Sequence, residues 1–279
     1  MTFTPTRDLM EAAALQGKGV GAFNVVHLET AEALVAAAEL ARLPVILQIS
    51  ENCVRYHGSL GPLAAATMAI ARQADVAVAV HLDHAEDEEL AREAIDLGFG
   101  SVMYDGAHLD YAGNTEATAR VTRYAHARGV YVEAELGKVG GKDGAHAPGV
   151  RTDPVEAAAF VRETGVDALA VAVGSSHAMK DRTASLDLPL ICRLRDALDV
   201  PLVLHGSSGV PDDEIVAAIC AGMTKINVST HLNGFFTRAL RQHLAKDPSV
   251  VDSRKYLGPA RDAVIPEAVR LLKVFHLDG

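Results

Sequence analysis

Short apolar runs rich in β-branched residues alternate with longer amphipathic stretches along the chain. Most of these runs are apolar at nearly every position, which is typical of strands that are buried on both faces. We expect strands at residues 21–25, 44–50, 76–82, 100–105, 130–136, 167–174, 201–206 and 224–229. The stretches between them space their apolar residues as helices do. One of them, DPVEAAAFVRETG, has Pro154 in its first turn and Gly165 at its end, which are signals for a helix start and end.

Eight strand–helix units in succession predict an α/β fold, a (β/α)8 TIM barrel formed as one domain by residues 1–279. An open, doubly wound sheet is the alternative, but such sheets usually have fewer strands and a glycine-rich turn after the first. Here His27, Leu28 and Glu29 follow the first strand instead. The last segment, with residues 259–272 inside it, is longer than a barrel needs, so we also expect a helical C-terminal extension.

Composition narrows the classes of function. Hydrophobic residues make up 49% of the 279 residues, which is enough for a large core. The net charge of −10 argues against non-specific binding to nucleic acid. The chain shows no signal-peptide pattern and no apolar run long enough to span a membrane. Its cysteines, Cys53, Cys192 and Cys220, form no CxxC pair, which fits a reducing cytoplasm. From these features together we expect a cytoplasmic protein without a membrane or nucleic-acid partner.

Polar residues follow the predicted strands, at the end where barrel enzymes have their active sites. All eight strands contribute, and the residues are Asn24, Ser50, Asp83 with His84, Asp105, Glu135, His177, His205 and Asn227. A single histidine at such a place is more often a hydrogen-bonded structural residue. Three at equivalent strand ends favour a metal site, because three neutral imidazoles are a ligand set of catalytic zinc. His81, earlier in the third strand, is expected in the core or behind a ligand.

Acidic residues near these histidines could take part in chemistry. Asp83 could cap the helix that follows it, or it could exchange a proton with a substrate hydroxyl. Glu133 and Glu135 lie two positions apart in a strand, so they point to the same face, where they need a cation or hydrogen-bond donors. The glycine-rich segment 137–149 follows them and is either mobile surface or an active-site lid.

Small residues after the seventh and eighth strands predict a phosphate site. They would expose backbone N–H groups at a helix start, which is a common phosphate site of barrels. The residues are Gly206, Ser207 and Ser208 in the first loop and Asn227, Ser229 and Thr230 in the second. The alternative is two ordinary turns. A Schiff-base mechanism is disfavoured, because Lys225 lies at the beginning of its strand, away from this end.

The motifs resemble those of the class II, metal-dependent ketose-bisphosphate aldolases that act on fructose or tagatose 1,6-bisphosphate. The strings HLDH, EAELG and LHGSSG carry the resemblance, and GAFNV, SVMYDG, KINVST and RKYLGPAR extend it over nearly the whole chain. The resemblance implies a TIM barrel and a zinc-dependent lyase. It also implies reversible cleavage of a ketose 1,6-bisphosphate to dihydroxyacetone phosphate and glyceraldehyde 3-phosphate, and a homodimer or homotetramer.

The resemblance also implies roles for individual residues. His84, His177 and His205 would bind zinc, and Asp83 would exchange a proton with the C4 hydroxyl. Asp105 and Glu135 match positions that orient this ion or hold a second divalent ion or a monovalent cation. Arg254 matches an arginine that some members offer to the distal phosphate in a neighbouring subunit. The residues expected to contact substrate or phosphate are Asn24, Ser50, Ala178, Lys180, Gly206, Ser207, Ser208, Asn227, Ser229 and Thr230.

The chain departs from the family's pattern at three places near the substrate. The family usually has a Glu-rich string after its Gly-Gly pair, whereas here KDG follows, so Asp143 is the expected catalytic substitute and His146 the alternative. The segment 177–180 is one residue shorter than the family's, and Ser229 stands where the family has Asp. These changes leave open an aldolase for another phosphorylated ketose, a zinc-dependent hydrolase or a non-catalytic sugar-phosphate binder.

Overall fold

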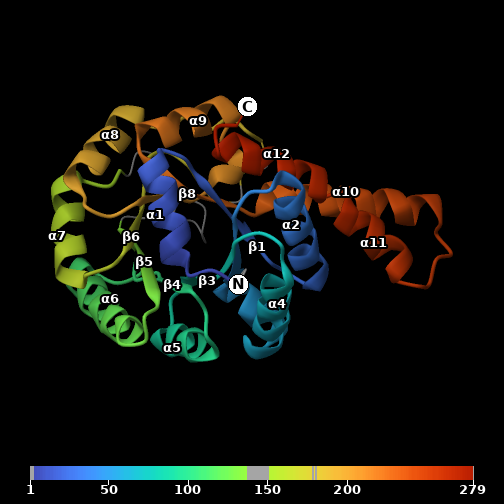
Figure 1. Ribbon diagram of the computed structural model, residues 1–279, viewed down its shortest axis with the longest axis horizontal. Helices are drawn as coiled ribbons and strands as arrows, with labels where there is room; N and C mark the ends of the chain where they lie inside the picture. Colours follow the sequence, from blue (N-terminus) through green and yellow to red (C-terminus); the bar gives the residue numbers. More distant parts are fainter. Residues whose placement is uncertain (1–2, 137–150, 178, 180, 279) are drawn as a thin grey trace.

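The computed structural model describes residues 3–136, 151–177, 179 and 181–278. Parallel strands close into a barrel in which each strand pairs with its neighbours in the sequence and β1 pairs with β8 (Figure 1). The strands are β1 (Val20–Asn24), β2 (Val45–Ser50), β3 (Val78–Ala85), β4 (Ser101–Tyr104), β5 (Tyr131–Leu136), β6 (Ala168–Val171), β7 (Leu202–Leu204) and β8 (Met223–Val228). The predicted (β/α)8 barrel is therefore confirmed.

Helices follow the strands and surround the barrel (Figure 1). They are α2 (Leu28–Ala41), α3 (Glu51–His57), α4 (Gly61–Gln73), α5 (Glu88–Leu97), α6 (Tyr111–His126), α7 (Pro154–Thr164), α8 (Leu188–Ala197) and α9 (Asp212–Ala221). The expected bounds of α7 are confirmed, because Pro154 opens it and Gly165 ends it in a left-handed conformation, with φ of 69°. The Asp153 carboxylate caps α7 by accepting backbone N–H groups of its first turn.

Helix α1 (Thr6–Gln16) covers one end of the barrel and is not among the elements that the sequence predicts. Its Leu9 and Met10 are buried against side chains in the barrel interior, among them Val20 and Ile46 from early positions of β1 and β2. This contact closes the end of the barrel at which the strands begin. The carboxyl ends of the strands are left as the open mouth.

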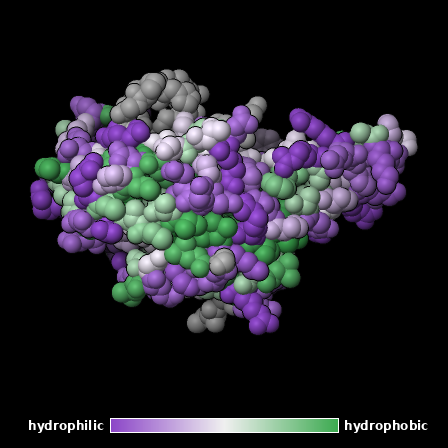
Figure 2. All heavy atoms as spheres, turned by 90° about the horizontal axis from the view of Figure 1, so that it is seen from above, coloured by the Kyte–Doolittle hydropathy of each residue, from purple (hydrophilic) through white to green (hydrophobic). Residues whose placement is uncertain are grey.

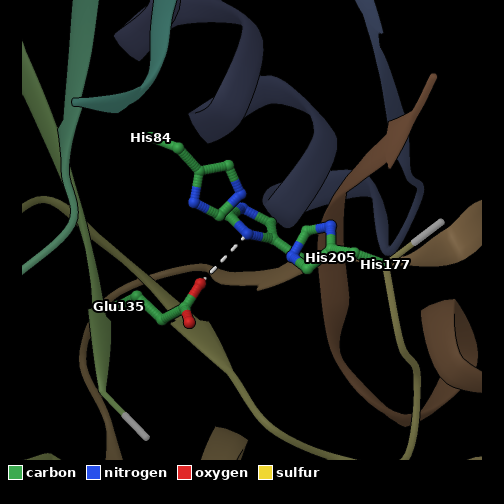
Figure 3. Close-up of side chains that lie close together, drawn as sticks. All are labelled: His84, Glu135, His177 and His205. Carbon is green, nitrogen blue, oxygen red and sulfur yellow. Dashed lines mark ion pairs between the residues drawn. The ribbon is translucent and has the colours of Figure 1, made fainter. Parts of the chain in front are cut away.

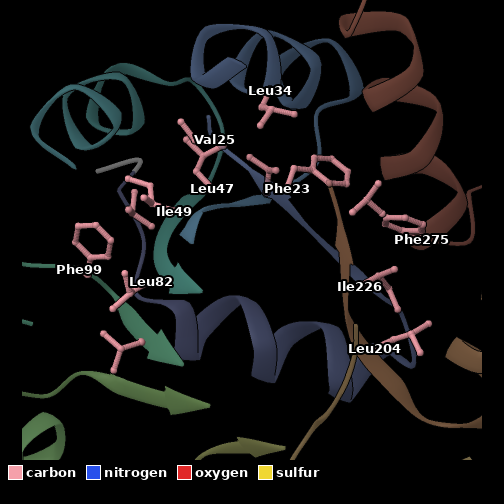
Figure 4. Close-up of a cluster of buried hydrophobic side chains, with 14 of the residues drawn as sticks. Phe23, Val25, Leu34, Leu47, Ile49, Leu82, Phe99, Leu204, Ile226 and Phe275 are labelled. Carbon is pink, nitrogen blue, oxygen red and sulfur yellow. The ribbon is translucent and has the colours of Figure 1, made fainter. Parts of the chain in front are cut away.

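The larger apolar core lies between the strands and the surrounding helices (Figure 4). Phe23 of β1 packs toward Leu34 of α2 and toward Phe275 near the C-terminus, and all three are almost completely buried. The ring centroids of Phe23 and Phe275 are 6.2 Å apart. Each such side chain stabilises the fold by about 1.5–3 kcal/mol. The apolar core between strands and helices therefore contributes much of the stability, so polar residues can line the open end of the barrel.

The chain ends in the helical extension that the sequence predicts. Helices α10 (Thr230–Lys246) and α11 (Arg254–Asp262) pack on each other and project beyond the barrel (Figure 1). Figure 2 shows the projecting part as mostly hydrophilic, with apolar residues gathered nearer its base. Helix α12 (Ile265–Phe275) returns to pack on α2 and β1. Within the described residues, the helices are too short or too polar to cross a membrane.

Two predicted strands end three residues away from the observed ends, whereas the bounds of the other six agree to within two residues. Strand β6 ends at Val171, earlier than the predicted range 167–174. Strand β3 continues to Ala85, beyond the predicted range 76–82. Its register with β4 shifts between Leu82 and Ala85, which is the mark of a β-bulge. The bulge matters for function, because it lies at the mouth of the barrel.

Candidate active site

The carboxyl ends of the strands line a cavity of about 240 Å³. Most of the residues that the sequence analysis singled out at strand ends lie around it. The predicted residues that line the cavity are Asn24, Ser50, Asp83, His84, His177, Gly206, Ser208, Asn227, Ser229 and Thr230. Gln48 also lines it and was missed, although it is the only polar residue inside the apolar run PVILQIS that precedes Ser50.

The structure brings the three strand-end histidines together with Glu135 (Figure 3). The ring centroid of His84 lies 4.5 Å from that of His205 and 5.0 Å from that of His177. One potential ligand atom from each of the four residues lies within 4.8 Å of the others. His205 is fully buried, and His84 and Glu135 are nearly so. Three imidazoles and a carboxylate in such a cluster have the donor chemistry that zinc prefers.

The bulge in β3 explains how two consecutive residues, Asp83 and His84, reach the same cavity. Neighbouring side chains of a regular strand point to opposite faces. His84 has a left-handed backbone conformation, with φ of 51°, which turns the chain at this point. For a non-glycine residue this conformation costs about 1–3 kcal/mol, and such strain is typical of functional sites. The sequence pattern alone did not predict it.

Carboxylates contact ring nitrogens of two of the imidazoles, those of His84 and His205. The Nδ1 atom of His84 lies 2.7 Å from Oδ2 of Asp105, a buried residue just after β4. This bond leaves Nε2 of His84 for another partner. His205 lies between two glutamates of β5, with Nε2 2.9 Å from Glu133 and Nδ1 3.3 Å from Glu135. Burial alone would lower the pKa of His205, but both glutamates raise it to about 9.

Asp83 is a buried carboxylate held by two amides. The Nδ2 atom of Asn24 donates to it at 3.1 Å, and that of Asn227 does so at 3.4 Å. Burial alone would raise the pKa of Asp83, but the charges of the neighbouring histidines and of Lys225 lower it to about 2. The carboxylate is therefore ionised at neutral pH and can accept a proton.

The interpretation of Asp83 as a helix cap is wrong. The N-cap of α5 is Asp87, whose carboxylate accepts the backbone N–H of Glu89 at 2.9 Å. Asp83 instead belongs to β3 and lies in the cavity. The error arose because β3 continues three residues past its predicted end, which moves the start of α5 along the chain.

The loops after β7 and β8 meet at the start of α10. Ser208 Oγ accepts the backbone N–H groups of Ser229 at 3.3 Å and of His231 at 3.2 Å. The Ser208 hydroxyl thus accepts N–H groups at the start of α10, and such groups at a helix start can also bind an anion. Gly206 has φ of 68°, and a Cβ there would lie 2.7 Å from the Ser176 backbone. The predicted Ser207 is less suited to bind a substrate, because its hydroxyl donates to the Leu204 carbonyl.

The remaining predicted residues lie elsewhere. Arg254 begins α11 on the projecting helices, where it is exposed and pairs with Asp252, and it does not line the cavity of its own chain. The predictions for Asp143, His146, Ala178 and Lys180 fall outside the described residues. Helices α10 and α11 carry the segment for which a subunit contact is expected.

Three comparisons with known proteins agree on one family. The family model described as "Fructose-bisphosphate aldolase class-II" matches residues 4–279. The fructose-bisphosphate aldolase of Geobacillus stearothermophilus is 43% identical, with 100% of this chain and 99% of the relative covered. That of Thermus caldophilus is 40% identical over 92% of each chain. Among solved structures, the YdjI aldolase from Escherichia coli K12 has a TM-score of 0.86 and 31% identity, with 99% and 98% of the two chains covered.

Proposed function

The chain belongs to the class II fructose-bisphosphate aldolase family of metal-dependent lyases, and on this premise we propose its substrate and the roles of its residues. The substrate is a ketose 1,6-bisphosphate of the fructose or tagatose type, cleaved reversibly to dihydroxyacetone phosphate and glyceraldehyde 3-phosphate. One observation carries the proposal: a zinc-type donor cluster, of which His84 and His177 line the cavity, lies beside an ionised Asp83 and loops suited to phosphate. We propose that residues 1–279 act as one aldolase domain.

His84, His177 and His205 would hold the catalytic zinc ion. Glu135 adds a carboxylate to the same cluster, and Asp105 orients His84 from behind. Either carboxylate could also take part in binding a second divalent ion or a monovalent cation. When bound, zinc supplies a Lewis acid that stabilises the negative charge formed next to the ketose carbonyl as the C3–C4 bond breaks.

Asp83 would accept the proton of the C4 hydroxyl while the C3–C4 bond breaks, and would return it in the condensation direction. Its two amide partners, Asn24 and Asn227, hold the carboxylate in one orientation beside His84. Gln48 supports Asn24 by donating to its Oδ1 at 2.9 Å. This chain of hydrogen bonds fixes the base before substrate binds, so little reorganisation is needed in the transition state.

The phosphate of the dihydroxyacetone half would bind at the start of α10. Gly206, Ser208, Ser229 and Thr230 line this part of the cavity, and backbone N–H groups already converge on Ser208. Ser50 lies at the end of β2 and would face the aldehyde half. We propose that Arg254 of a neighbouring subunit completes the distal phosphate site, in a homodimer or homotetramer. The sparse cysteines agree with action in the cytoplasm.

An aldolase for another phosphorylated ketose is the second candidate. Ser229 lines the cavity where the sequence resemblance expects Asp, so a contact with the substrate would differ from that of the family. A zinc-dependent hydrolase has less support, because it would not need the Asn227–Asp83 bond or the phosphate loops. A non-catalytic binder would not need an ionised carboxylate beside the metal cluster.

A panel of ketose mono- and bisphosphates separates these functions. The purified protein should contain zinc and should release triose phosphate from fructose or tagatose 1,6-bisphosphate in a coupled assay. A strong chelator should abolish the activity and zinc should restore it. Full activity in the metal-free protein, or inactivation by borohydride in the presence of substrate, would refute the proposal.

A further inference from the structure

A line of buried polar side chains runs from His205 through the interior of the barrel, away from the mouth. Glu133 Oε1 lies 2.9 Å from Nε2 of His205, and its other oxygen accepts the Lys225 ammonium at 2.8 Å. The Lys225 Nζ atom also lies 3.4 Å from Nε2 of His81. One carboxylate therefore connects a candidate metal ligand to a buried lysine.

The line continues to the closed end of the barrel. Nδ1 of His81 lies 2.7 Å from Oγ of Ser101, and this hydroxyl lies 2.7 Å from that of Thr6, the first residue of α1. Burial and the Lys225 charge lower the pKa of His81 to about 3, so this imidazole is neutral. Its Nε2 can then accept a hydrogen bond from the Lys225 ammonium while its Nδ1–H donates one to Ser101.

Fold stability does not account for a charged pair at this place. Glu133 and Lys225 are each 1% exposed, and Lys225 is the only buried lysine or arginine in the part of the chain that the structure describes. Two ions lose their hydration on burial, and apolar residues of the same volume are often as stable or more stable. Lys225 also does not line the cavity of the candidate active site, so it cannot reach a substrate carbonyl.

The geometry assigns the pair a role at the metal site, on the premise that His205 binds zinc as proposed above. We propose that Lys225 is a positioning residue: by holding one oxygen of Glu133, it aims the other at Nε2–H of His205. With zinc bound, His205 would give up its Nδ1 proton, keep the proton on Nε2 that Glu133 accepts, and offer the Nδ1 lone pair to the metal. Without Lys225, the Glu133 carboxylate would be a buried charge with one partner fewer and a less defined orientation.

The zinc affinity of the metal-depleted protein tests this role without reference to catalysis. We expect Lys225→Met to raise the Kd for zinc by about 10- to 100-fold in competition with a chromophoric chelator, the scale seen for groups behind metal ligands. Lys18→Met is the matched control, since Lys18 pairs with His276 and Asp278 near the surface and should leave the Kd unchanged. If Lys225→Met lowers the melting temperature but binds zinc as the wild type does, the lysine is merely structural.

A double mutant tests whether Lys225 acts through Glu133. Glu133→Gln keeps the shape and weakens the acceptor, so it should also raise the zinc Kd. Lys225→Met should then add less than about 3-fold to the Kd in the Glu133→Gln background, because contacts in one network are not additive. If Lys225→Met alone fails to fold, Glu133→Gln can still be compared with the double variant, in which neither member of the buried ion pair is charged. Equal losses in both backgrounds would overturn the route, whereas a wild type without zinc affinity would refute the proposed function itself.

Discussion

Asp83→Ala is the sharpest test of the active site. General acid–base catalysis contributes about 10²- to 10⁴-fold to a rate, which corresponds to about 3–5 kcal/mol of barrier. Asp83 is buried, ionised and already held by the amides of Asn24 and Asn227, so its removal should cost at least the lower of these values. We expect kcat for cleavage to fall by about 10²-fold or more.

The same substitution should leave the earlier chemistry of the site largely intact. The donor cluster for zinc lacks Asp83, so the zinc content should remain that of the wild type. Asp83 is proposed to act on the C4 hydroxyl, which dihydroxyacetone phosphate does not have. Exchange of the C3 proton of dihydroxyacetone phosphate with solvent, followed by NMR in deuterated water, should therefore continue within a few-fold of the wild-type rate.

Asp87→Ala is the matched control, because Asp87 is the true cap of α5 and lies four residues away. Its loss should reduce the free energy of unfolding by about 1 kcal/mol and leave kcat unchanged. If Asp83→Ala cleaves the bisphosphate at a rate near that of the wild type, the base lies elsewhere. If it stops proton exchange as well as cleavage, Asp83 positions the whole site and does not act on C4 alone.

Three further predictions concern the phosphate loop, the C-terminal helices and the assembly. Gly206→Ala should lower the free energy of unfolding by about 1–3 kcal/mol and raise KM, because Cβ would overlap Ser176 at a left-handed φ. Burial would raise the pKa of Glu267, but hydrogen bonds from His231 and Arg270 lower it to about 2. This contribution to stability is therefore present above pH 4–5 and lost as the pH falls toward 2. The free energy of unfolding, measured with urea at several pH values, should depend less on pH over that window in Glu267→Gln than in the wild type. Light scattering at micromolar concentration should show a dimer or tetramer, and a monomer would contradict the role proposed for Arg254.

The repeating pattern of apolar runs was enough to predict the barrel, because every strand of a closed parallel sheet is buried on both faces. The same pattern could not show α1, since Leu9 and Met10 become core residues only when a barrel end is available to receive them. The bounds of β3 were missed for a related reason. His84 and Asp83 look like loop residues, but the bulge keeps them within the strand.

The sequence was enough to predict those residues of the candidate site that lie at the carboxyl ends of strands. Side chains that follow parallel strands meet at one end of a barrel, so His84 and His205 could be placed together before any coordinates. Their supporting carboxylates are harder to assign from the sequence, because Asp105 and Glu135 both lie at or near the ends of strands that neighbour those of the histidines. In the structure Asp105 lies behind His84, whereas Glu135 belongs to the donor cluster.

The buried network of His205, Glu133, Lys225 and His81 could not be predicted from the individual strands. The position of Lys225 early in its strand correctly argues against a Schiff base, but it says nothing about what lies across the barrel. Its partners Glu133 and His81 are 92 and 144 residues away in the sequence. They meet only because the closed sheet sets β3, β5 and β8 at particular heights, and the registers of β3 with β4 and of β7 with β8 both shift. Lys225 lies too deep in the barrel to contact a substrate. It can still influence the metal site, because the Glu133 carboxylate contacts both Lys225 and His205.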